Sequence, residues 1–160
     1  MGRRAIQISA AVAAALVLVA PAAASHRVPG TLHRGLQSMA RTFEWPAAGT
    51  ITTPFTSWHD GIDIGMLRSL TILAAAGGRV ELVGYAQGYS GYGNVVVVDV
   101  APHVQAIYAH LSSFEVHPDQ RVRMGQVVGV AGCTGMCTGT HLHFEMRVNG
   151  VAVDPRYFLR

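Results

Sequence analysis

Alternating polar and apolar residues near the carboxyl end bring several chemically active side chains together. His141, His143 and Glu145 alternate with leucine, phenylalanine and methionine over positions 141–146. Side chains of a strand point alternately to its two faces, so the apolar three face a core and the polar three share the other face. Histidine is the commonest metal ligand and an unusual choice for a solvent-facing polar row, which is the alternative interpretation. The segment is therefore predicted to be a strand that carries part of a metal site.

A second group of polar side chains lies in the middle of the chain. His59 and Asp63 alternate with Ile62 and Ile64 across a glycine-containing segment. In an extended chain the imidazole and the carboxylate face one way, and the two isoleucines face the other way, into a core. Such a pair can supply two ligands to a zinc ion. Taken alone the signal is weak, because a surface histidine and aspartate at this spacing are the more common case.

A third candidate is a single histidine at the end of an apolar run. His110 closes the segment 104–110 and follows Tyr108 and Ala109. Functional side chains concentrate where strands give way to loops. A lone histidine at such a place is usually structural or solvated, so His110 gains weight only from the two other groups.

Short apolar runs separated by glycine and proline must position these side chains. The predicted strands are 79–85, 94–100, 104–110, 126–132 and 141–148, each of ordinary strand length. Gly77-Gly78 and the glycine-rich stretch 84–93 are typical of turns. No segment after residue 45 has a convincing helical period. An all-β fold, a compact antiparallel sandwich or barrel, is expected.

The amino-terminal segment has the layout of a secretory signal peptide. A positive start over 1–4 precedes an uncharged run over 5–20, and Ala22-Ala23-Ala24 has the small-x-small form of a cleavage site. We expect a signal peptide over 1–24 and export to the cell wall or periplasm. The run is shorter than the ~20 residues of a membrane span, so no stable span is expected after cleavage. An uncleaved anchor is the alternative.

Residues 25–43 are predicted to form a linker or a short helix. Leucine, methionine and phenylalanine recur there at spacings of three and four, as on one face of a helix. The residues from 44 to 160 form the expected domain.

The overall charge gives no electrostatic reason to expect a nucleic-acid partner. The formal net charge is +3, and removal of Arg3 and Arg4 with the signal peptide would leave +1. Nucleic-acid binding requires clustered cations on one face.

Half of the residues are hydrophobic and 13% are charged, which excludes a disordered chain.

The three groups together resemble the lysostaphin-type (LytM-like) zinc metallopeptidases, which cut peptide cross-links of peptidoglycan. The resemblance runs from about Trp45 to Pro155. The motifs that carry it are His59-x-x-x-Asp63, Tyr108-Ala109-His110-Leu111, His141-Leu142-His143-Phe144-Glu145, Trp45-Pro46, Tyr92-Gly93-Asn94, Gly125-Gln126 and Thr138-Gly139.

The resemblance implies a ligand set, a catalytic pair and a fold. His59, Asp63 and His143 would bind one zinc ion, while His110 and His141 would form the catalytic pair. The family fold is a small antiparallel β-sandwich or barrel-like domain, a duplicated hybrid motif, with an open groove across one sheet. Two imidazoles and one carboxylate leave a fourth zinc position open for water, as in catalytic zinc sites.

The implied function is a secreted zinc metalloendopeptidase with a zinc-bound water as nucleophile. One histidine of the pair would act as general base and the other would stabilise the transition state. Peptidoglycan stem or bridge peptides would be the substrates, and a monomer is expected.

The chain departs from the family pattern in the loop before the last histidines. Thr140 replaces a frequent proline, and Cys133 and Cys137 stand where serine is usual. A Cys-x-x-x-Cys spacing could serve a metal or redox site, but in an exported protein a disulfide is expected.

The roles of five further residues remain open. Glu145 either orients a zinc ligand by accepting its hydrogen bond or is an exposed residue at a strand end. Tyr85, Tyr89 and Tyr92 either wall a peptide groove or cover a sheet edge. Asn94 is a further groove candidate.

Three other functions could explain some of these residues. A cupin metalloenzyme is excluded, because Arg147 and Val148 occupy the positions where its glutamate ligand would lie. A non-catalytic, restrained or partner-activated cell-wall regulator or binding module is the main alternative, although all five metal and catalytic positions are filled. A zinc-binding protein would explain the ligands but not His110.

Overall fold

The computed structural model describes residues 37, 39, 40, 42–85 and 87–160. The predicted signal peptide and most of segment 25–43 lie outside the described residues. Within the described part, no helix has the length and apolar character needed to cross a membrane.

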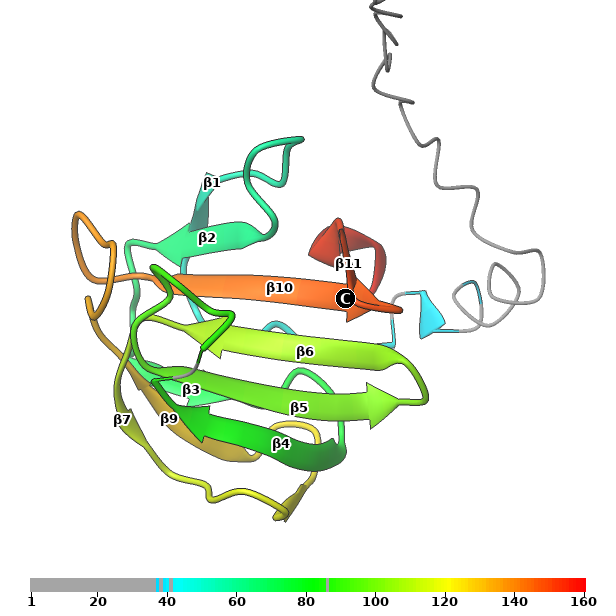
Figure 1. Cartoon of the computed structure of the whole chain (residues 1–160). Helices are drawn as coiled ribbons and strands as arrows, with labels where there is room; N and C mark the ends of the chain where they lie inside the picture. Colours follow the sequence, from blue (N-terminus) through cyan, green and yellow to red (C-terminus); the bar gives the residue numbers. More distant parts are fainter. Residues whose placement is uncertain (1–36, 38, 41, 86) are drawn as a thin grey trace, which may run out of the picture.

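A large antiparallel sheet forms the body of the molecule. Figure 1 shows β10 between β2 and β6 in the order β1-β2-β10-β6-β5-β4-β8. These strands are β1 Thr50–Thr53, β2 Ile62–Gly65, β4 Gly78–Gly84, β5 Val95–Ala101, β6 Val104–Ala109, β8 Arg121–Val122 and β10 Leu142–Val148. An eighth strand, β11 Val151–Val153, pairs with the second half of β10.

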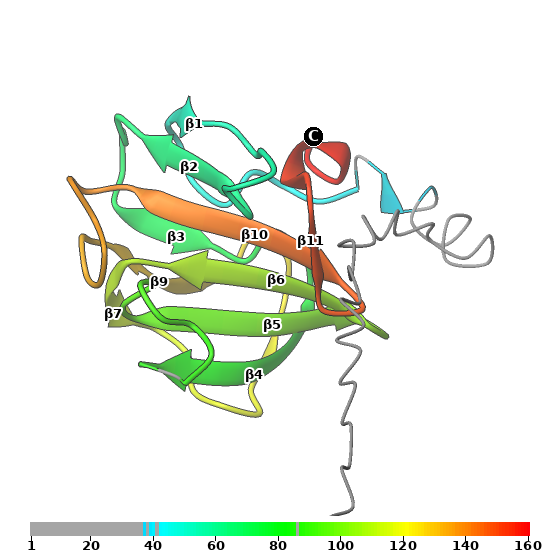
Figure 2. The same ribbon diagram turned by 45° about the horizontal axis from the view of Figure 1, so that its top comes forward.

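A second, three-stranded sheet covers one face of the large sheet. It has the order β3-β9-β7, with β3 Thr71–Leu73, β7 Leu111–Phe114 and β9 Val127–Ala131. Figure 2 shows these strands behind the large sheet. Apolar side chains of both sheets, including Ile72, Val128 and Phe144, form one fully buried core. The transfer of this apolar surface out of water is the main stabilising contribution to such a sandwich.

The outer face of the large sheet, which points away from the small sheet, is also partly buried. Val95, Val97, Ile107 and Ala109 form a separate buried cluster on this face, and Tyr89 and Tyr92 pack against it. The two tyrosines belong to the glycine-rich stretch before β5. This stretch therefore folds over the sheet and forms one wall of a depression on the outer face.

The all-β prediction is confirmed, as are the five predicted strands. The observed β4, β5, β6, β9 and β10 match them to within one residue at each end. The two sheets do not close into a barrel, and the described residues after position 44 contain one short helical element, the 3-10 turn Pro155–Tyr157. Phe43, which was assigned to the linker, is buried and stacks on Phe158 with ring centroids 5.6 Å apart.

Candidate metal centre

The register between β2 and β10 brings Asp63 and His143 together. The two residues are direct partners across the antiparallel pair, and on its other side His143 is opposite the small side chain of Ala109. Ile62 and Ile64 lie in the core, as the alternation predicted. The polar residues of both strands therefore emerge on the outer face, at one level of the sheet.

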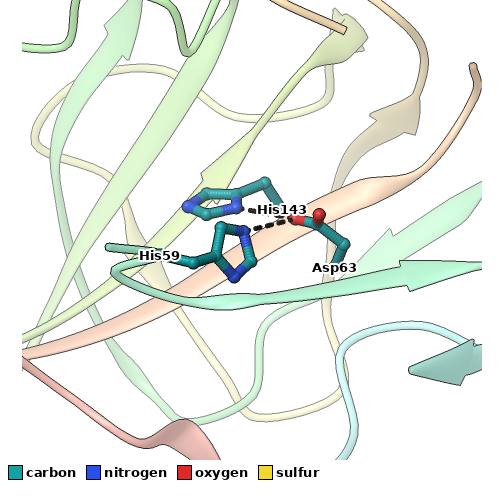
Figure 3. A group of neighbouring side chains, drawn as sticks. All are labelled: His59, Asp63 and His143. Atoms are coloured by element: carbon teal, nitrogen blue, oxygen red, sulfur yellow. Dashed lines mark hydrogen bonds and ion pairs between the residues drawn. The ribbon is translucent and has the colours of Figure 1, made fainter. Parts of the chain in front are cut away.

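A tight turn places His59 beside Asp63 and His143. Thr56 and His59 form an isolated antiparallel bridge, which brings the His59 ring back over β2. His59 Nε2 lies 3.2 Å from Asp63 Oδ1, and His143 Nδ1 lies 2.8 Å from the same oxygen. Figure 3 shows the two rings converging on this carboxylate from different segments.

The spacing of these atoms fits a zinc ion. One ligand atom from each of the three residues lies within 4.8 Å of the others. Tetrahedral zinc with bonds of about 2.0–2.1 Å requires neighbouring ligand atoms to be about 3.3 Å apart. Two nitrogens and one carboxylate oxygen are donors that zinc accepts. The three residues thus have the donor types and the spacing that a zinc ion requires.

Hydrogen bonds at the far side of each imidazole orient all four histidines of the site. A carbonyl or carboxylate oxygen only accepts, so the nitrogen facing it must carry the hydrogen. In the neutral rings of His110 and His141 the opposite nitrogen then presents its lone pair towards the depression, whereas in His59 and His143 the opposite nitrogen faces Asp63 Oδ1. The four bonds are His59 Nδ1 to Pro54 O (2.9 Å), His110 Nδ1 to Thr134 O (2.7 Å), His141 Nδ1 to Gly139 O (2.7 Å) and His143 Nε2 to Glu145 Oε1 (2.9 Å).

The two histidines predicted to be catalytic lie next to each other beside the ligand group. The ring centroids of His110 and His141 are 4.7 Å apart. His141 Nε2 lies 3.7 Å from Asp63 Oδ1. His110 directly follows β6 with a left-handed backbone, φ +61°, which is uncommon for a residue other than glycine.

All five predicted metal and catalytic residues line one pocket of about 420 Å³ on the outer face. Trp58 and Met136, which the sequence did not single out, also line it and are 87% and 82% exposed. The sequence offers one hint for Trp58, namely a large apolar residue that stands directly before His59.

Glu145 is fully buried, which contradicts the interpretation as an exposed strand-end residue. It accepts hydrogen bonds from His143 and from the Tyr92 hydroxyl, and its second oxygen pairs with Arg147 Nε at 2.7 Å. Arg147 also donates to the Tyr92 hydroxyl at 3.1 Å. A buried carboxylate needs such partners to offset its lost hydration. Tyr92 belongs to the glycine-rich stretch 84–93. This stretch folds over the outer face of the sheet and thereby buries Glu145.

The charges of this network shift three pKa values. Burial alone would lower the pKa of His143, but its hydrogen bonds to Asp63 and Glu145 outweigh burial and raise the pKa to about 9. Burial would raise the pKa values of Asp63 and Glu145, yet hydrogen bonds from His143 hold both below their usual range. In the metal-free protein His143 is therefore a cation between two carboxylates.

Burial lowers the pKa of His110, against the opposing effect of its hydrogen bond to the Thr134 carbonyl. At neutral pH this ring is accordingly a neutral proton acceptor.

The groove candidates occupy three different positions. Tyr92 lines the pocket itself, while Tyr85 and Tyr89 line a neighbouring hollow. The two hollows share Ser90, Gly91 and Met136, so they adjoin.

Asn94 does not line the pocket. Its side chain donates to Leu111 O at 3.0 Å and so ties the start of β5 to β7.

The expected disulfide between Cys133 and Cys137 is present. It closes the loop that precedes β10, and Cys137 lines the pocket. The loop contains Thr134, whose carbonyl holds His110 and which the sequence did not reveal as part of the site.

Residues 57–155 match the sequence profile of peptidase family M23. The match covers more than half of the chain and includes every residue of the metal and histidine groups. The chain belongs to peptidase family M23. The resemblance drawn from the separate motifs is thereby confirmed.

Two curated relatives of this M23 domain have names that state different functions. The DD-carboxypeptidase/endopeptidase Mpg of Neisseria meningitidis is 41% identical over 97 residues, which are 61% of this chain and 22% of Mpg. The murein hydrolase activator NlpD of Escherichia coli is 35% identical over 121 residues, 74% of this chain and 31% of NlpD. The chain thus spans about a fifth to a third of the length of these relatives.

Solved structures with the same fold include two peptidases. A zinc-containing peptidase from Vibrio cholerae aligns with a TM-score of 0.65 at 27% identity, covering 73% of this chain and 40% of that chain. Lysostaphin from Staphylococcus simulans aligns with a TM-score of 0.59 at 29% identity, covering 73% of this chain and 51% of that chain.

Proposed function

We propose that this M23 domain is an exported zinc metalloendopeptidase that hydrolyses peptide cross-links of bacterial peptidoglycan. One observation carries the proposal: two histidines with inward-facing lone pairs stand beside a three-residue ligand group in the same open pocket. A purely structural zinc site would have four protein ligands and no need of the second histidine pair. The murein-related name of NlpD and the endopeptidase name of Mpg support the choice of substrate.

The site residues divide the work between binding and proton transfer. When bound by His59, Asp63 and His143, zinc would lower the pKa of a coordinated water towards about 7 and polarise the substrate carbonyl. In the neutral rings of His141 and His110 the proton-accepting nitrogen is Nε2, which faces the pocket, since the Nδ1 atoms donate to carbonyls. One ring receives the proton of the attacking water, and the pair returns a proton to the leaving amine. The bonds to Gly139 and Thr134 strengthen when a ring becomes positively charged.

The charge of the pocket favours internal peptide bonds over a carboxyl-terminal one. A carboxypeptidase needs a cation to bind the free carboxylate of its substrate, usually an arginine. Among the described residues that line the pocket there is no arginine, and the whole chain has no lysine. The exposed carboxylate of Asp60 lies in the lining and would repel a free terminus.

Digestion of purified peptidoglycan by the mature chain, residues 25–160, tests the proposal. New peptide termini should appear with the zinc-loaded protein, vanish when a chelator removes the metal, and return when zinc is restored. The identity of the new termini names the bond that is cut.

A second candidate function is a catalytically restrained or partner-activated cell-wall regulator. The similarity to NlpD, a murein hydrolase activator, favours it. The presence of all five metal and catalytic side chains favours the enzyme instead. A folded, zinc-loaded protein that cuts no peptide bond in peptidoglycan would support the regulator.

A further inference from the structure

We propose that Thr134, inside the disulfide-closed loop 133–137, is the positioning residue for His110. The inference rests on the proposed function in one respect, namely that His110 acts there as a proton-transfer group. The Thr134 carbonyl accepts the hydrogen bond from His110 Nδ1 at 2.7 Å, so it decides which ring nitrogen faces the pocket. Thr134 thus acts on the reaction through His110.

The Thr134 hydroxyl fixes the position of this carbonyl. It accepts a hydrogen bond from the Asn94 backbone N–H at 2.9 Å and donates one to the Leu111 carbonyl at 3.0 Å. One side chain therefore joins the loop to the first turn before β5 and to the residue after His110. A hydroxyl is required for both bonds, because no other side chain of this shape can donate and accept at once.

Backbone hydrogen bonds from the neighbouring segment 92–94 hold the left-handed backbone of His110. The His110 N–H donates to Tyr92 O at 2.9 Å, and the Leu111 N–H donates to Asn94 O at 3.1 Å. A strained conformation of this kind persists only where its surroundings determine it. Residues 92–94 and Thr134 provide these surroundings from two separate segments.

The glycine-rich stretch and the loop fit against each other without space for further atoms. A Cβ atom at Gly93 would lie 2.4 Å from the Thr134 carbonyl carbon, and one at Gly135 would lie 2.4 Å from Gly91 O. The Met136 N–H donates to Gly91 O at 2.7 Å. The disulfide joins the residues on either side of this contact, at positions 133 and 137. The loop is thus held at its ends and at its centre.

The zinc ligands do not depend on the loop. In the described part of the chain, the hydrogen bonds of His59, Asp63 and His143 go to residues outside 133–137. A change at Thr134 should therefore alter proton transfer while metal binding stays as it is.

Two substitutions at one position test this separation. Thr134→Val keeps the shape and removes the hydroxyl, whereas Thr134→Ser keeps the hydroxyl and is the matched control. For Thr134→Val we expect kcat to fall ~10- to 100-fold, a part of the ~10²- to 10⁴-fold that a general acid–base group contributes. KM and the zinc dissociation constant should change less than about twofold, and Thr134→Ser should retain most of the wild-type kcat.

A readout that needs no peptidase activity separates this inference from the proposed function. Long-range ¹H–¹⁵N NMR of the zinc-loaded protein should show His110 with hydrogen on Nδ1 in the wild type and Thr134→Ser. In Thr134→Val it should show loss of this single tautomer. An unchanged His110 ring and kcat in Thr134→Val would overturn the proposal, as would equal loss of zinc affinity and kcat. If the wild type cuts no peptide at all, the proposed function fails while the NMR result still decides the role of Thr134.

The disulfide provides a second test should Thr134→Val fail to fold. The Cys133→Ser/Cys137→Ser double variant keeps every hydrogen bond of Thr134 available but opens the ring. We expect a lower kcat and mixed His110 tautomers with unchanged zinc affinity. A double variant with wild-type kcat and a single Nδ1–H tautomer would contradict a positioning role for the closed loop.

Discussion

His143 connects the metal group to the buried charges beneath it, because its two ring nitrogens face Asp63 and Glu145. Because His143 Nε2 donates a hydrogen bond to Glu145, Nδ1 is the only atom of the ring that can bind a metal. Glu145 is in turn held by Arg147 and Tyr92. At the scale of single residues, the orientation of His143, a proposed zinc ligand, is therefore set by side chains outside the proposed ligand group.

The substitution Glu145→Gln should weaken zinc binding about 10- to 100-fold, the usual cost of losing such a supporting acceptor. The amide keeps the shape of the carboxylate but has no negative charge to favour the Nε2–H form of His143. Titration of the metal-free protein with zinc measures the change. Glu115→Gln, at an exposed position away from the pocket, is the matched control, and equal affinities in the two variants would contradict the role of Glu145.

Zinc affinity should rise with pH through the neutral range. The pKa of His143 is raised to about 9 in the metal-free protein, so below pH 9 zinc must displace a proton from this ring. We expect affinity to increase by about tenfold per pH unit between pH 7 and 9, with release of about one proton. Calorimetry in buffers of different ionisation enthalpy gives the proton count, and a count near zero at pH 7 would argue against a charged His143.

The same pKa shift makes the metal-free fold sensitive to alkaline pH. A raised folded-state pKa stabilises the fold fully below the unfolded value of about 6.5, and this contribution is lost as pH rises through about 9.

At the scale of elements, the centre depends on how closely β2 and β10 approach. Gly61 lies just before β2, and a Cβ atom there would be 2.5 Å from Phe144 O and 3.0 Å from His143 Cε1. The strand that carries Asp63 can reach the strand that carries His143 only because this position has no side chain. The glycine between the two residues of the His59–Asp63 motif thus has a packing role.

Gly61→Ala should force the two strands apart and destabilise the fold by about 1–3 kcal/mol, the usual cost of overpacking. Zinc affinity should fall as well, since the Asp63–His143 spacing widens. Thermal unfolding and zinc titration of the variant measure both effects. Gly139→Ala is the control, because no atom lies within 4 Å of the Cβ it would add, and equal behaviour of the two variants would refute this explanation.

At the scale of the whole molecule, the sequence predicted the long strands, and the five residues that it nominated for the site gather in one pocket, but the arrangement of the strands could not be predicted. β4, β5, β6, β9 and β10 carry enough alternating or apolar residues to show a pattern. The edge strands β1, β8 and β11 have two to four residues, too few for any periodicity. Their positions follow from pairing with neighbours that are distant in the chain.

The residue types of the candidate site could be predicted, because each motif lies within a few neighbouring positions. The contacts between the motifs could not be predicted, because they join residues that are far apart in the sequence. Tyr92 and Glu145 are 53 positions apart, and His110 and Thr134 are 24 apart. The burial of Glu145 could not be read from β10 alone, since the cover comes from the glycine-rich stretch.

The charge of the pocket predicts a preference among substrates. A peptide whose carboxyl terminus lies next to the scissile bond should be cut more slowly as the free acid than as its amide, because Asp60 is in the pocket lining and the described lining residues include no arginine to bind the carboxylate. We expect a difference of about fivefold or more in kcat/KM, comparable to one weak charge interaction. Asp60→Asn should reduce the difference, and faster cleavage of the free acid would contradict an endopeptidase pocket.

Cleavage of a defined cross-linked muropeptide dimer, followed by mass spectrometry, tests the central claim most directly. The zinc-loaded wild type and a His117→Ala control, altered at an exposed histidine outside the pocket, should both convert the dimer to monomers. His141→Ala should keep its zinc and leave the dimer intact. A folded wild type with one zinc ion per chain that leaves the dimer uncut, or a His141→Ala variant that cuts it at the wild-type rate, would contradict a metalloendopeptidase that uses this histidine pair.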